Sequence, residues 1–393
     1  MLTGNPTAVM SQKSKREYLL AIWGRYQRVG RRFKSKILDE FCAVCGYARK
    51  YAIGLLNRKP RLREKRPGPK RKYDAVLGPL KVLWLLSDRM CSKRLKAALP
   101  IWLPFYEAAH GVLAPTVRKQ LLHVSPATID RLLKQVRARY PRKGLSGTRC
   151  GPEALKHRIP VRTDNWDIDQ PGFLEADSVA HCGDSMAGEF VWSLTFTDIF
   201  SQWTENRAIW NKSAAEVVDR VREVEQKLPF PLKGFDVDNG SEFLTWHLWR
   251  YFLDRPAPVD LRRSRPYKKN DQAHVEQKNW THVRQLLGYE RIEGVQMVKR
   301  INELYETWGL LHNFFCPTLK LKRKTRVGSR TIRKYAKAQT PCQRLLACPH
   351  LSTERKTQLR DRLAELNPIQ LKNKLEEQLN ILFNQMRIRS ARS

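Results

Sequence analysis

Hydrophobic positions change their spacing partway along the chain, from a helical period to short continuous runs. Between residues 11 and 57, and again between residues 74 and 109, apolar residues recur every three or four positions, which predicts amphipathic helices. Beyond Pro171, short runs rich in aromatic and β-branched residues predict strands that alternate with helices. The predicted elements are strands at 172–178, 190–198 and 203–210, a helix at 212–227, a strand at 232–238, a helix at 242–253, a strand at 259–262 and a helix at 272–287. This order predicts an α/β domain around one mixed sheet, at 171–312, preceded by all-α modules.

The first helices have the pattern of a helix-turn-helix. Gly46 separates two short helices, and Arg49 and Lys50 open the second one. Basic residues at the start of such a helix suit contact with DNA, so residues 1–57 are predicted to form a DNA-binding module. A generic small helical bundle remains the alternative.

A second helical module is predicted at residues 73–140. Within it, Ser125 is a good helix N-cap and Pro126 suits the first helical position. The helix that they open resembles a second recognition helix, and its residues Thr128 and Arg131 would face a DNA groove.

The charge of the chain indicates a polyanionic partner, which the pattern of helices and strands alone does not. Its 74 Lys and Arg against 38 Asp and Glu give a net charge of +36 and an isoelectric point near 10.2. Such an excess favours nucleic acid as the partner. Basic, proline-containing stretches predict linkers at 58–72 and 141–170, which either follow a DNA groove or are merely solvated.

Two further segments complete the predicted organisation. Residues 313–345 form another basic segment, and residues 346–393 form a helical tail with an apolar seam. The seam suits either a docking or self-association helix or a helix that packs on its own chain.

Membrane and secretory signals are absent from the pattern. The first 16 residues lack the apolar core of a signal peptide, and no run of 18 apolar residues exists. The eight cysteines are scattered, which favours reduced thiols over a disulfide framework. We therefore expect a cytoplasmic protein with no membrane partner.

Asp238 stands at the end of the predicted strand 232–238. Asn239-Gly240 then allows a sharp reversal, because both residues tolerate positive φ, and Ser241 is a good cap for the next helix. A carboxylate in this position points out at the sheet edge, where α/β folds bind ligands.

Two other acids share this kind of context. Asp177 lies in the first predicted strand, which the layout places beside the strand of Asp238, and Glu276 lies near the start of the last helix. Carboxylate oxygens are the ligands that hard divalent cations prefer. Two such ions, Mg²⁺ or Mn²⁺, can activate a hydroxyl group and stabilise a leaving oxygen at phosphorus.

These residues resemble a known catalytic core. Asp177, the motif at 238–243 (DNGSEF) and the helix at 274–279 (HVEQKN) resemble the D, D, E core of retroviral integrases and of bacterial insertion-sequence transposases. The resemblance covers roughly residues 170 to 312 and implies a ribonuclease-H-like fold. The interval from Asp238 to Glu276 is slightly longer than in retroviral integrases, and the His/Cys zinc module of those proteins is absent, which favours the bacterial branch.

The resemblance implies a function and a set of partners. It makes Asp177, Asp238 and Glu276 the catalytic acids that bind two metal ions, and it places Lys278 and Asn279 at the DNA end. The expected activity is cleavage at the ends of a mobile element and strand transfer into target double-stranded DNA, by a homo-oligomer. The resemblance also implies a bacterial, nucleoid-associated protein. The alternatives are a nuclease or resolvase of the same fold, and a DNA-binding regulator with an inert core.

Other acids compete for these roles. Asp236 shares the strand face of Asp238 but lies one pleat deeper. Asp198 ends the second strand and suits a structural role, and Glu242 is expected to stabilise a helix N-terminus.

Three further side chains could take part in chemistry. His181 and Cys182 are expected to be ordinary loop residues, with a nucleophile or a metal site as the alternative. His274 lies two residues from Glu276 and could approach the scissile phosphate.

Overall fold

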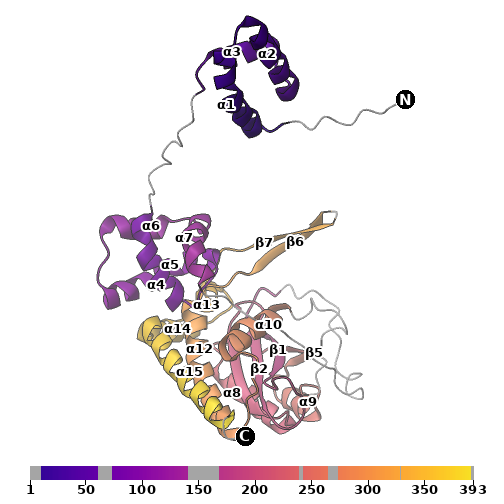
Figure 1. The fold of residues 1–393 in the computed structure, drawn as a ribbon. Helices are drawn as coiled ribbons and strands as arrows, with labels where there is room; N and C mark the ends of the chain where they lie inside the picture. The colour runs from indigo at the N-terminus through magenta and orange to yellow at the C-terminus, as the bar shows by residue number, and fades with distance from the viewer. Residues whose placement is uncertain are drawn as a thin grey trace. The chain divides into compact units, whose positions relative to one another are not determined.

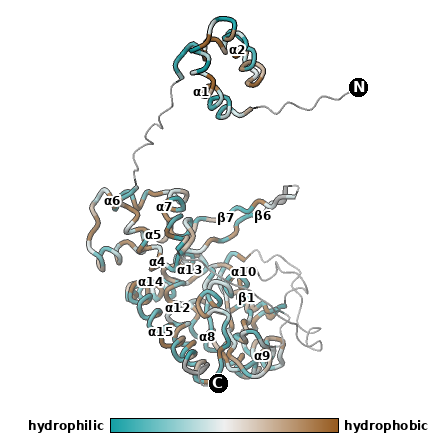
Figure 2. Tube along the Cα trace, viewed as in Figure 1, coloured by the Kyte–Doolittle hydropathy of each residue, from teal (hydrophilic) through white to brown (hydrophobic). Residues whose placement is uncertain are grey.

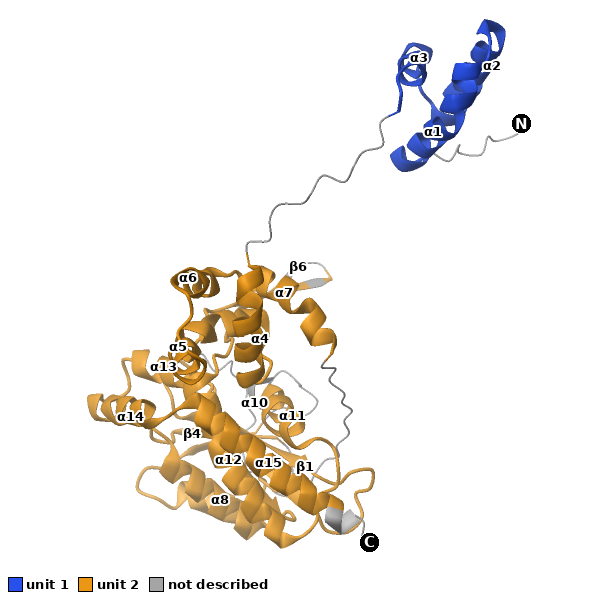
Figure 3. Ribbon diagram, turned by 60° about the vertical axis from the view of Figure 1, so that its left-hand side comes forward, with its two compact units in different colours: residues 1–72 blue, residues 73–393 orange. Residues whose placement is uncertain are grey.

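The computed structural model divides the chain into two compact units, Met1–Lys72 and Tyr73–Ser393, which Figure 3 colours separately. It describes the residues in the following ranges: 10–60, 73–139, 168–238, 242–263, 273–327 and 329–390. Most of both predicted linkers, the turn at Asn239-Gly240 and the predicted helix cap Ser241 lie outside these ranges. Within the described ranges, no helix is long and apolar enough to cross a membrane, and the seven cysteines found there are free thiols.

The first unit contains three helices, α1 (Gln12–Arg28), α2 (Arg31–Cys45) and α3 (Arg49–Asn57). Their apolar faces enclose a small core in which Phe41, Ala52 and Leu56 are fully buried. Gly46 follows α2 with a φ of 67°, a left-handed conformation that glycine adopts without strain. The predicted pair of helices around Gly46 is therefore confirmed.

The second unit opens with a short 3₁₀ turn, Asp74–Val76, and four helices: α4 (Leu77–Leu86), α5 (Ser92–His110), α6 (Pro115–His123) and α7 (Pro126–Ala138). α7 begins where its capping residues predict, because Ser125 Oγ accepts a hydrogen bond from Thr128 N at 3.2 Å. Only Val124 and Ser125 separate α6 from α7, so these two helices form a tight pair.

These helices pack against the α/β part of the second unit. Trp102 Nε1 donates a hydrogen bond to Phe315 O at 2.9 Å, and Arg94 Nε donates to Pro317 O at 2.6 Å. The buried apolar residues of both parts form one continuous cluster. Residues 73–140, predicted as a module of their own, thus belong to the same compact unit as the sheet.

One five-stranded sheet forms the centre of the second unit, with strands β1 (Phe173–Ala180), β2 (Val191–Asp198), β3 (Thr204–Trp210), β4 (Gly234–Val237) and β5 (Asp260–Arg263). The strands lie in the order β3-β2-β1-β4-β5. The pairs β1–β2 and β2–β3 are antiparallel, whereas β1–β4 and β4–β5 are parallel. The predicted mixed sheet, with its first and fourth strands side by side, is confirmed.

Helices cover this sheet, namely α8 (Ala214–Lys227), α9 (Trp246–Leu253), α10 (Ala273–Lys278), a π-helical turn (Asn279–Arg284), α11 (Gln285–Leu287) and α12 (Val295–Phe315). α12 lies along β3, and α10 lies against β1 and β2 (Figure 1). The helix predicted from residue 242 begins only at Trp246, because Thr245 Oγ1 caps it by accepting a hydrogen bond from Leu248 N at 3.3 Å.

The C-terminal part holds a hairpin and three helices: β6 (Leu321–Val327), β7 (Arg330–Tyr335), α13 (Pro341–Ala347), α14 (Thr353–Glu365) and α15 (Pro368–Ser390). The sequence pattern did not indicate the hairpin. α15 packs back on α12: Leu375 and Leu382 are buried, and Gln378 Nε2 donates to Glu303 O at 3.3 Å. Apolar and polar residues alternate along α15 in Figure 2, as one buried face requires.

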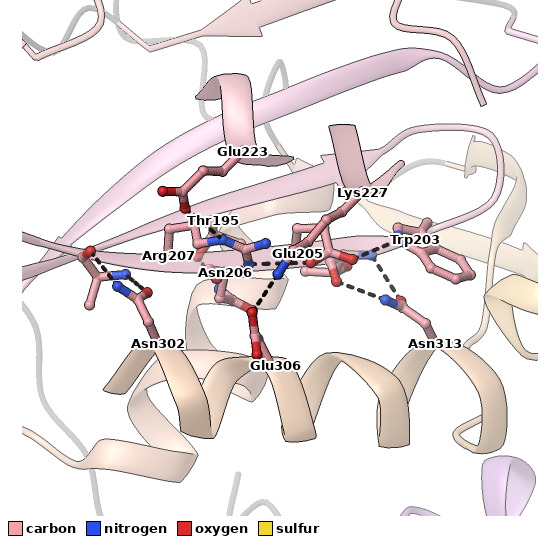
Figure 4. A network of polar contacts seen from close by, with 12 residues as sticks. Thr195, Trp203, Glu205, Asn206, Arg207, Glu223, Lys227, Asn302, Glu306 and Asn313 are labelled. Atoms are coloured by element: carbon pink, nitrogen blue, oxygen red, sulfur yellow. Dashed lines mark hydrogen bonds and ion pairs between the residues drawn. The ribbon is translucent and has the colours of Figure 1, made fainter. Parts of the chain in front are cut away.

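The outer edge of the sheet is closed by two asparagine side chains of α12 (Figure 4). Asn302 Oδ1 accepts from Ala208 N at 2.7 Å, and its Nδ2 donates to Ala208 O at 3.1 Å. Asn313 pairs in the same way with Thr204, at 3.0 and 2.9 Å. The outward-facing backbone groups of Thr204 and Ala208 on edge strand β3 are thereby satisfied, which fixes α12 on the sheet.

Replacement of Asn313 by Ala should destabilise the second unit. Both backbone groups of Thr204 would lose their buried partner, at roughly 1–3 kcal/mol each, so we expect the free energy of unfolding to fall by about 3 kcal/mol. Urea titration followed by tryptophan fluorescence measures this change. The matched control is Asn373→Ala, at an exposed position of α15, which should cost less than about 0.5 kcal/mol. Equal effects of the two substitutions would contradict the edge-closing role.

Candidate functional site

The pairing of β1 with β4 brings two of the predicted acids together. Glu175 lies opposite Asp236, and Ala176 lies opposite Val237. Continued by one residue, this parallel register makes Asp177, within β1, the neighbour of Asp238, which directly follows β4. Adjacent strands are about 4.8 Å apart, so the two carboxylates lie beside each other on one face of the sheet.

Electrostatic effects show that the third predicted acid lies in the same region. The pKa of Asp177 is raised to about 8, first by burial and next by repulsion from Asp238. Glu242 and Glu276 raise it further. The three acids singled out from the sequence therefore share one electrostatic environment, to which Glu242 also belongs.

Two hydrogen bonds orient the carboxylate of Asp177. Ser178 N donates to Oδ1 at 2.7 Å, and Asn279 Nδ2 donates to Oδ2 at 2.5 Å. Asn279 begins the π-helical turn after α10, three residues beyond Glu276, so this turn connects the helix of one acid to the strand of another. Asn279, predicted to face the DNA end, thus has its amide group turned toward Asp177.

Glu242 has a different role from the predicted one. It cannot stabilise the start of α9, because that helix begins at Trp246. Its buried carboxylate accepts hydrogen bonds from Ser178 Oγ and from Lys212 Nζ, the latter at 2.9 Å. Lys212 therefore neutralises the charge of Glu242, which also contacts Ser178, the residue next to Asp177.

Glu175 is a functional residue that the sequence analysis missed. Its side chain is buried two positions before Asp177, and Oε2 accepts a hydrogen bond from Val275 N at 3.1 Å. A carboxylate that accepts from a backbone N–H in the first turn stabilises a helix N-terminus, so Glu175 fixes the start of α10 to β1. A signal was present in the sequence, since an acid at this position points to the same side of the strand as Asp177.

The other acids differ from the three candidates in their surroundings. Asp236 is fully buried, opposite Glu175 and deeper in the sheet than Asp238. Asp198 is fully buried as well, and its carboxylate accepts hydrogen bonds from Gly172 N, Ser201 N and Ser201 Oγ at 2.9, 2.7 and 2.6 Å. Asp198 thus holds the turn after β2, in agreement with the structural role expected for it.

Lys278 is not at the DNA-facing surface where the sequence analysis expected it. Only 5% of it is exposed, and Nζ donates to Gln202 O at 3.4 Å. Burial, and next the positive charge of Arg94, lower the pKa of Lys278 to about 7. Its position, two residues after Glu276, makes it an anchor of α10 to the turn between β2 and β3.

The histidine and cysteine that follow β1 have structural contacts. His181 is buried rather than in an open loop; Nε2 and Ser193 Oγ are 2.7 Å apart, and burial lowers the pKa of His181 to about 3. Cys182 is half-buried, and its Sγ donates to Gly183 O at 3.5 Å. The side chain of His274 lies outside the part of the chain that the structure describes.

The residues of the helical modules that were predicted to face DNA differ in their exposure and in the contacts of their side chains. Arg49 is exposed but bound to α2 through Asp39 and, at 2.8 Å, through Ser35 Oγ, whereas Lys50 is exposed on α3. Thr128 is half-buried, and its Oγ1 accepts from Arg131 at 3.1 Å. Arg131 itself is exposed.

The carboxylates of the candidate site are ligands that suit a divalent cation, although in this structure their side chains are not arranged around a single ion position. Among the described residues, no three His, Cys, Asp or Glu side chains are arranged so that they could hold a metal ion. The donor chemistry nevertheless fits, because mutually repelling carboxylates are what Mg²⁺ and Mn²⁺ stabilise. Beside them, Asn279 Oδ1 is buried and has no hydrogen-bond partner among the described groups, so it could accept from an ion's hydration water.

The raised pKa of Asp177 predicts how the metal-free protein responds to pH. A carboxyl group whose pKa rises on folding, here from 3.8 to about 8, gives stability that is fully present below pH 3.8. That contribution is lost as the pH rises through about 8. In a chelating buffer, we therefore expect the stability contributed by Asp177 to fall by a few kcal/mol between about pH 4 and 8.

Urea titrations of the wild type and of Asp177→Asn over this range test the expectation. The substitution should flatten the pH dependence, while Asp219→Asn, at an exposed position of α8, should leave it unchanged. Parallel curves for the wild type and Asp177→Asn would contradict the electrostatic coupling of the acids.

Comparison with known proteins gives one clear relationship. No protein-family model matches the chain. It is 40% identical over 344 residues to the uncharacterized protein y4rM of Sinorhizobium fredii (strain NBRC 101917 / NGR234), an alignment that covers 85% of this chain and 96% of y4rM. The chain therefore belongs to the same protein family as y4rM.

Proposed function

We propose that this protein is a DDE-type DNA transposase, which cleaves the ends of a mobile element and joins them to target DNA. The observation that carries the proposal is the parallel β1–β4 pairing, which makes Asp177 and Asp238 neighbours in a region that Glu276 also influences. The mixed sheet, with helices packed on it, supports a ribonuclease-H-like core. Glu276 comes from a helix that both Glu175 and Lys278 anchor to the sheet.

Asp177, Asp238 and Glu276 are the residues that would hold two divalent ions. When bound, these ions supply Lewis-acid activation of an attacking hydroxyl and stabilisation of the leaving oxygen at phosphorus. The protein itself supplies the geometry. Asn279 and Ser178 N orient the Asp177 carboxylate, and Glu175 holds the first turn of α10, so that Glu276 starts from a fixed backbone position.

DNA binding is assigned to the helical modules and the basic surface. Lys50 on α3 and Arg131 on α7 are exposed near the starts of helices that follow short turns, as recognition helices require. A net charge of +36 would draw DNA to the protein and make binding weaken steeply with salt. Joining both ends of an element requires two active sites, so we propose that the protein works as a homo-oligomer on DNA.

Replacement of Glu276 by Gln should abolish strand transfer while leaving DNA binding intact. The substitution removes a negatively charged metal ligand but keeps the size of the side chain, so we expect a loss of at least about 1,000-fold, equivalent to roughly 4 kcal/mol of transition-state stabilisation. The assay joins a pre-cleaved element end, taken from DNA that flanks the gene, to a plasmid in Mg²⁺.

The matched control is Glu290→Gln, at an exposed position beyond α11, which should retain activity. Unaltered joining by Glu276→Gln would overturn the site assignment. Hydrolysis of DNA ends by the wild type without any joined product would favour the nuclease or resolvase alternative.

Replacement of Asn279 by Ala should weaken metal binding and activity together. The variant loses the hydrogen bond that orients Asp177, and partners of metal ligands typically contribute 10–100-fold to metal affinity. Titration of activity against Mn²⁺ concentration should show a shift of this size to higher concentration. A lower maximal rate with no change in the Mn²⁺ requirement would contradict the orienting role.

A further inference from the structure

The hairpin β6–β7 is a basic element with exposed cations on both of its strands. Residues 317–340 contain nine Lys and Arg and no acid. In Figure 1 the hairpin extends away from the sheet and the helices of the second unit. Its exposed cations include Lys322 and Arg323 on β6 and Arg333 and Lys334 on β7.

The hairpin lacks the packing that normally stabilises a pair of strands. Ile332 is 49% exposed and Tyr335 is 47% exposed, so apolar side chains also face solvent. A two-stranded hairpin is marginally stable in water by itself, and the repulsion of its cations weakens it further. A polyanion that lies against the hairpin would neutralise this repulsion and cover the apolar side chains.

In contrast, the base of the hairpin is firmly held. Three successive carbonyl groups of the turn between β2 and β3 accept hydrogen bonds from three cations. Lys320 Nζ donates to Phe200 O at 3.0 Å, and Arg344 donates to Ser201 O at 3.0 Å. The third cation is Lys278, whose Nζ donates to the next carbonyl group at 3.4 Å.

This turn therefore links the hairpin to the candidate catalytic helix. Lys320 precedes β6 directly, and Arg344 also binds Thr318, through Oγ1 and through the carbonyl oxygen, both at 2.6 Å. Lys278 lies two residues after Glu276 in the same helical segment. The base of the hairpin and the helix that carries Glu276 are therefore bound to the same turn.

We propose that the β6–β7 hairpin is a DNA-binding arm that places a duplex relative to the acid cluster. The inference rests on the proposed function, because it assigns the arm to the DNA on which the acids act. A two-stranded ribbon fits the major groove, which is about 12 Å wide. Exposed cations on both strands can reach the phosphates on either side of the groove, and a strand of β6's length spans roughly 20 Å.

The test compares two variants of the full chain that lose the same charge. The hairpin variant is Lys322→Ala, Arg323→Ala, Arg333→Ala and Lys334→Ala; the control variant changes four other exposed cations, namely Lys299→Ala, Arg300→Ala, Arg360→Ala and Lys374→Ala. Fluorescence anisotropy with a short labelled duplex of mixed sequence measures affinity between about 50 and 200 mM salt.

The hairpin variant should bind at least about tenfold more weakly, and its slope of log affinity against log salt should be smaller by about 3–4, since each lost phosphate contact removes roughly 0.9. The control variant should lose clearly less in both quantities. A second hairpin variant keeps the charge by exchanging Lys and Arg at these four positions, and it should bind like the wild type. Circular dichroism melting checks that all variants are folded.

The outcomes distinguish a failure of the DNA-binding arm from a failure of the proposed function. Retained affinity and slope in the hairpin variant, or equal losses in the hairpin and control variants, would overturn the arm while DNA binding by the protein stands. A wild-type chain that does not bind the duplex, or that binds with no salt dependence, would overturn both the arm and the transposase proposal.

Discussion

The parallel pairing of β1 with β4 is the contact on which the candidate site depends. Its register places Asp177 beside Asp238, and a shift by one residue would turn one of these side chains to the opposite face of the sheet. The same strand supplies Glu175, which fixes the start of α10. Thus β1 positions both the acids of the sheet and the helix that carries Glu276.

This arrangement costs stability that other parts of the unit must offset. Burial, and next repulsion from Asp238, raise the pKa of Asp177, so ionising this carboxyl group in the metal-free protein is unfavourable. The opposing contributions lie elsewhere: Asn302 and Asn313 close the sheet edge, and α15 packs its apolar face on α12. A rigid frame around a strained polar centre is typical of functional sites.

Much of the core could be predicted from the sequence, because strands rich in aromatic and β-branched residues have strong local signals. The neighbouring positions of Asp177 and Asp238 followed from strand order alone. The start of α9 was wrong because Ser241 is a good cap by local rules, whereas Thr245 makes the actual capping bond. Lys278 was misplaced because lysine is rarely buried, and only tertiary contacts show its carbonyl partner. The hairpin was missed since its basic residues hid a weak strand pattern.

The central claim is that Asp177, Asp238 and Glu276 form one site for divalent cations. The most direct measurement is a crystal of the protein soaked in Mn²⁺, with diffraction data collected at an energy where manganese scatters anomalously. The account predicts anomalous density between the carboxylates of Asp177 and Asp238, with Glu276 turned toward it. Anomalous density elsewhere on the chain, with none at these carboxylates, would contradict it.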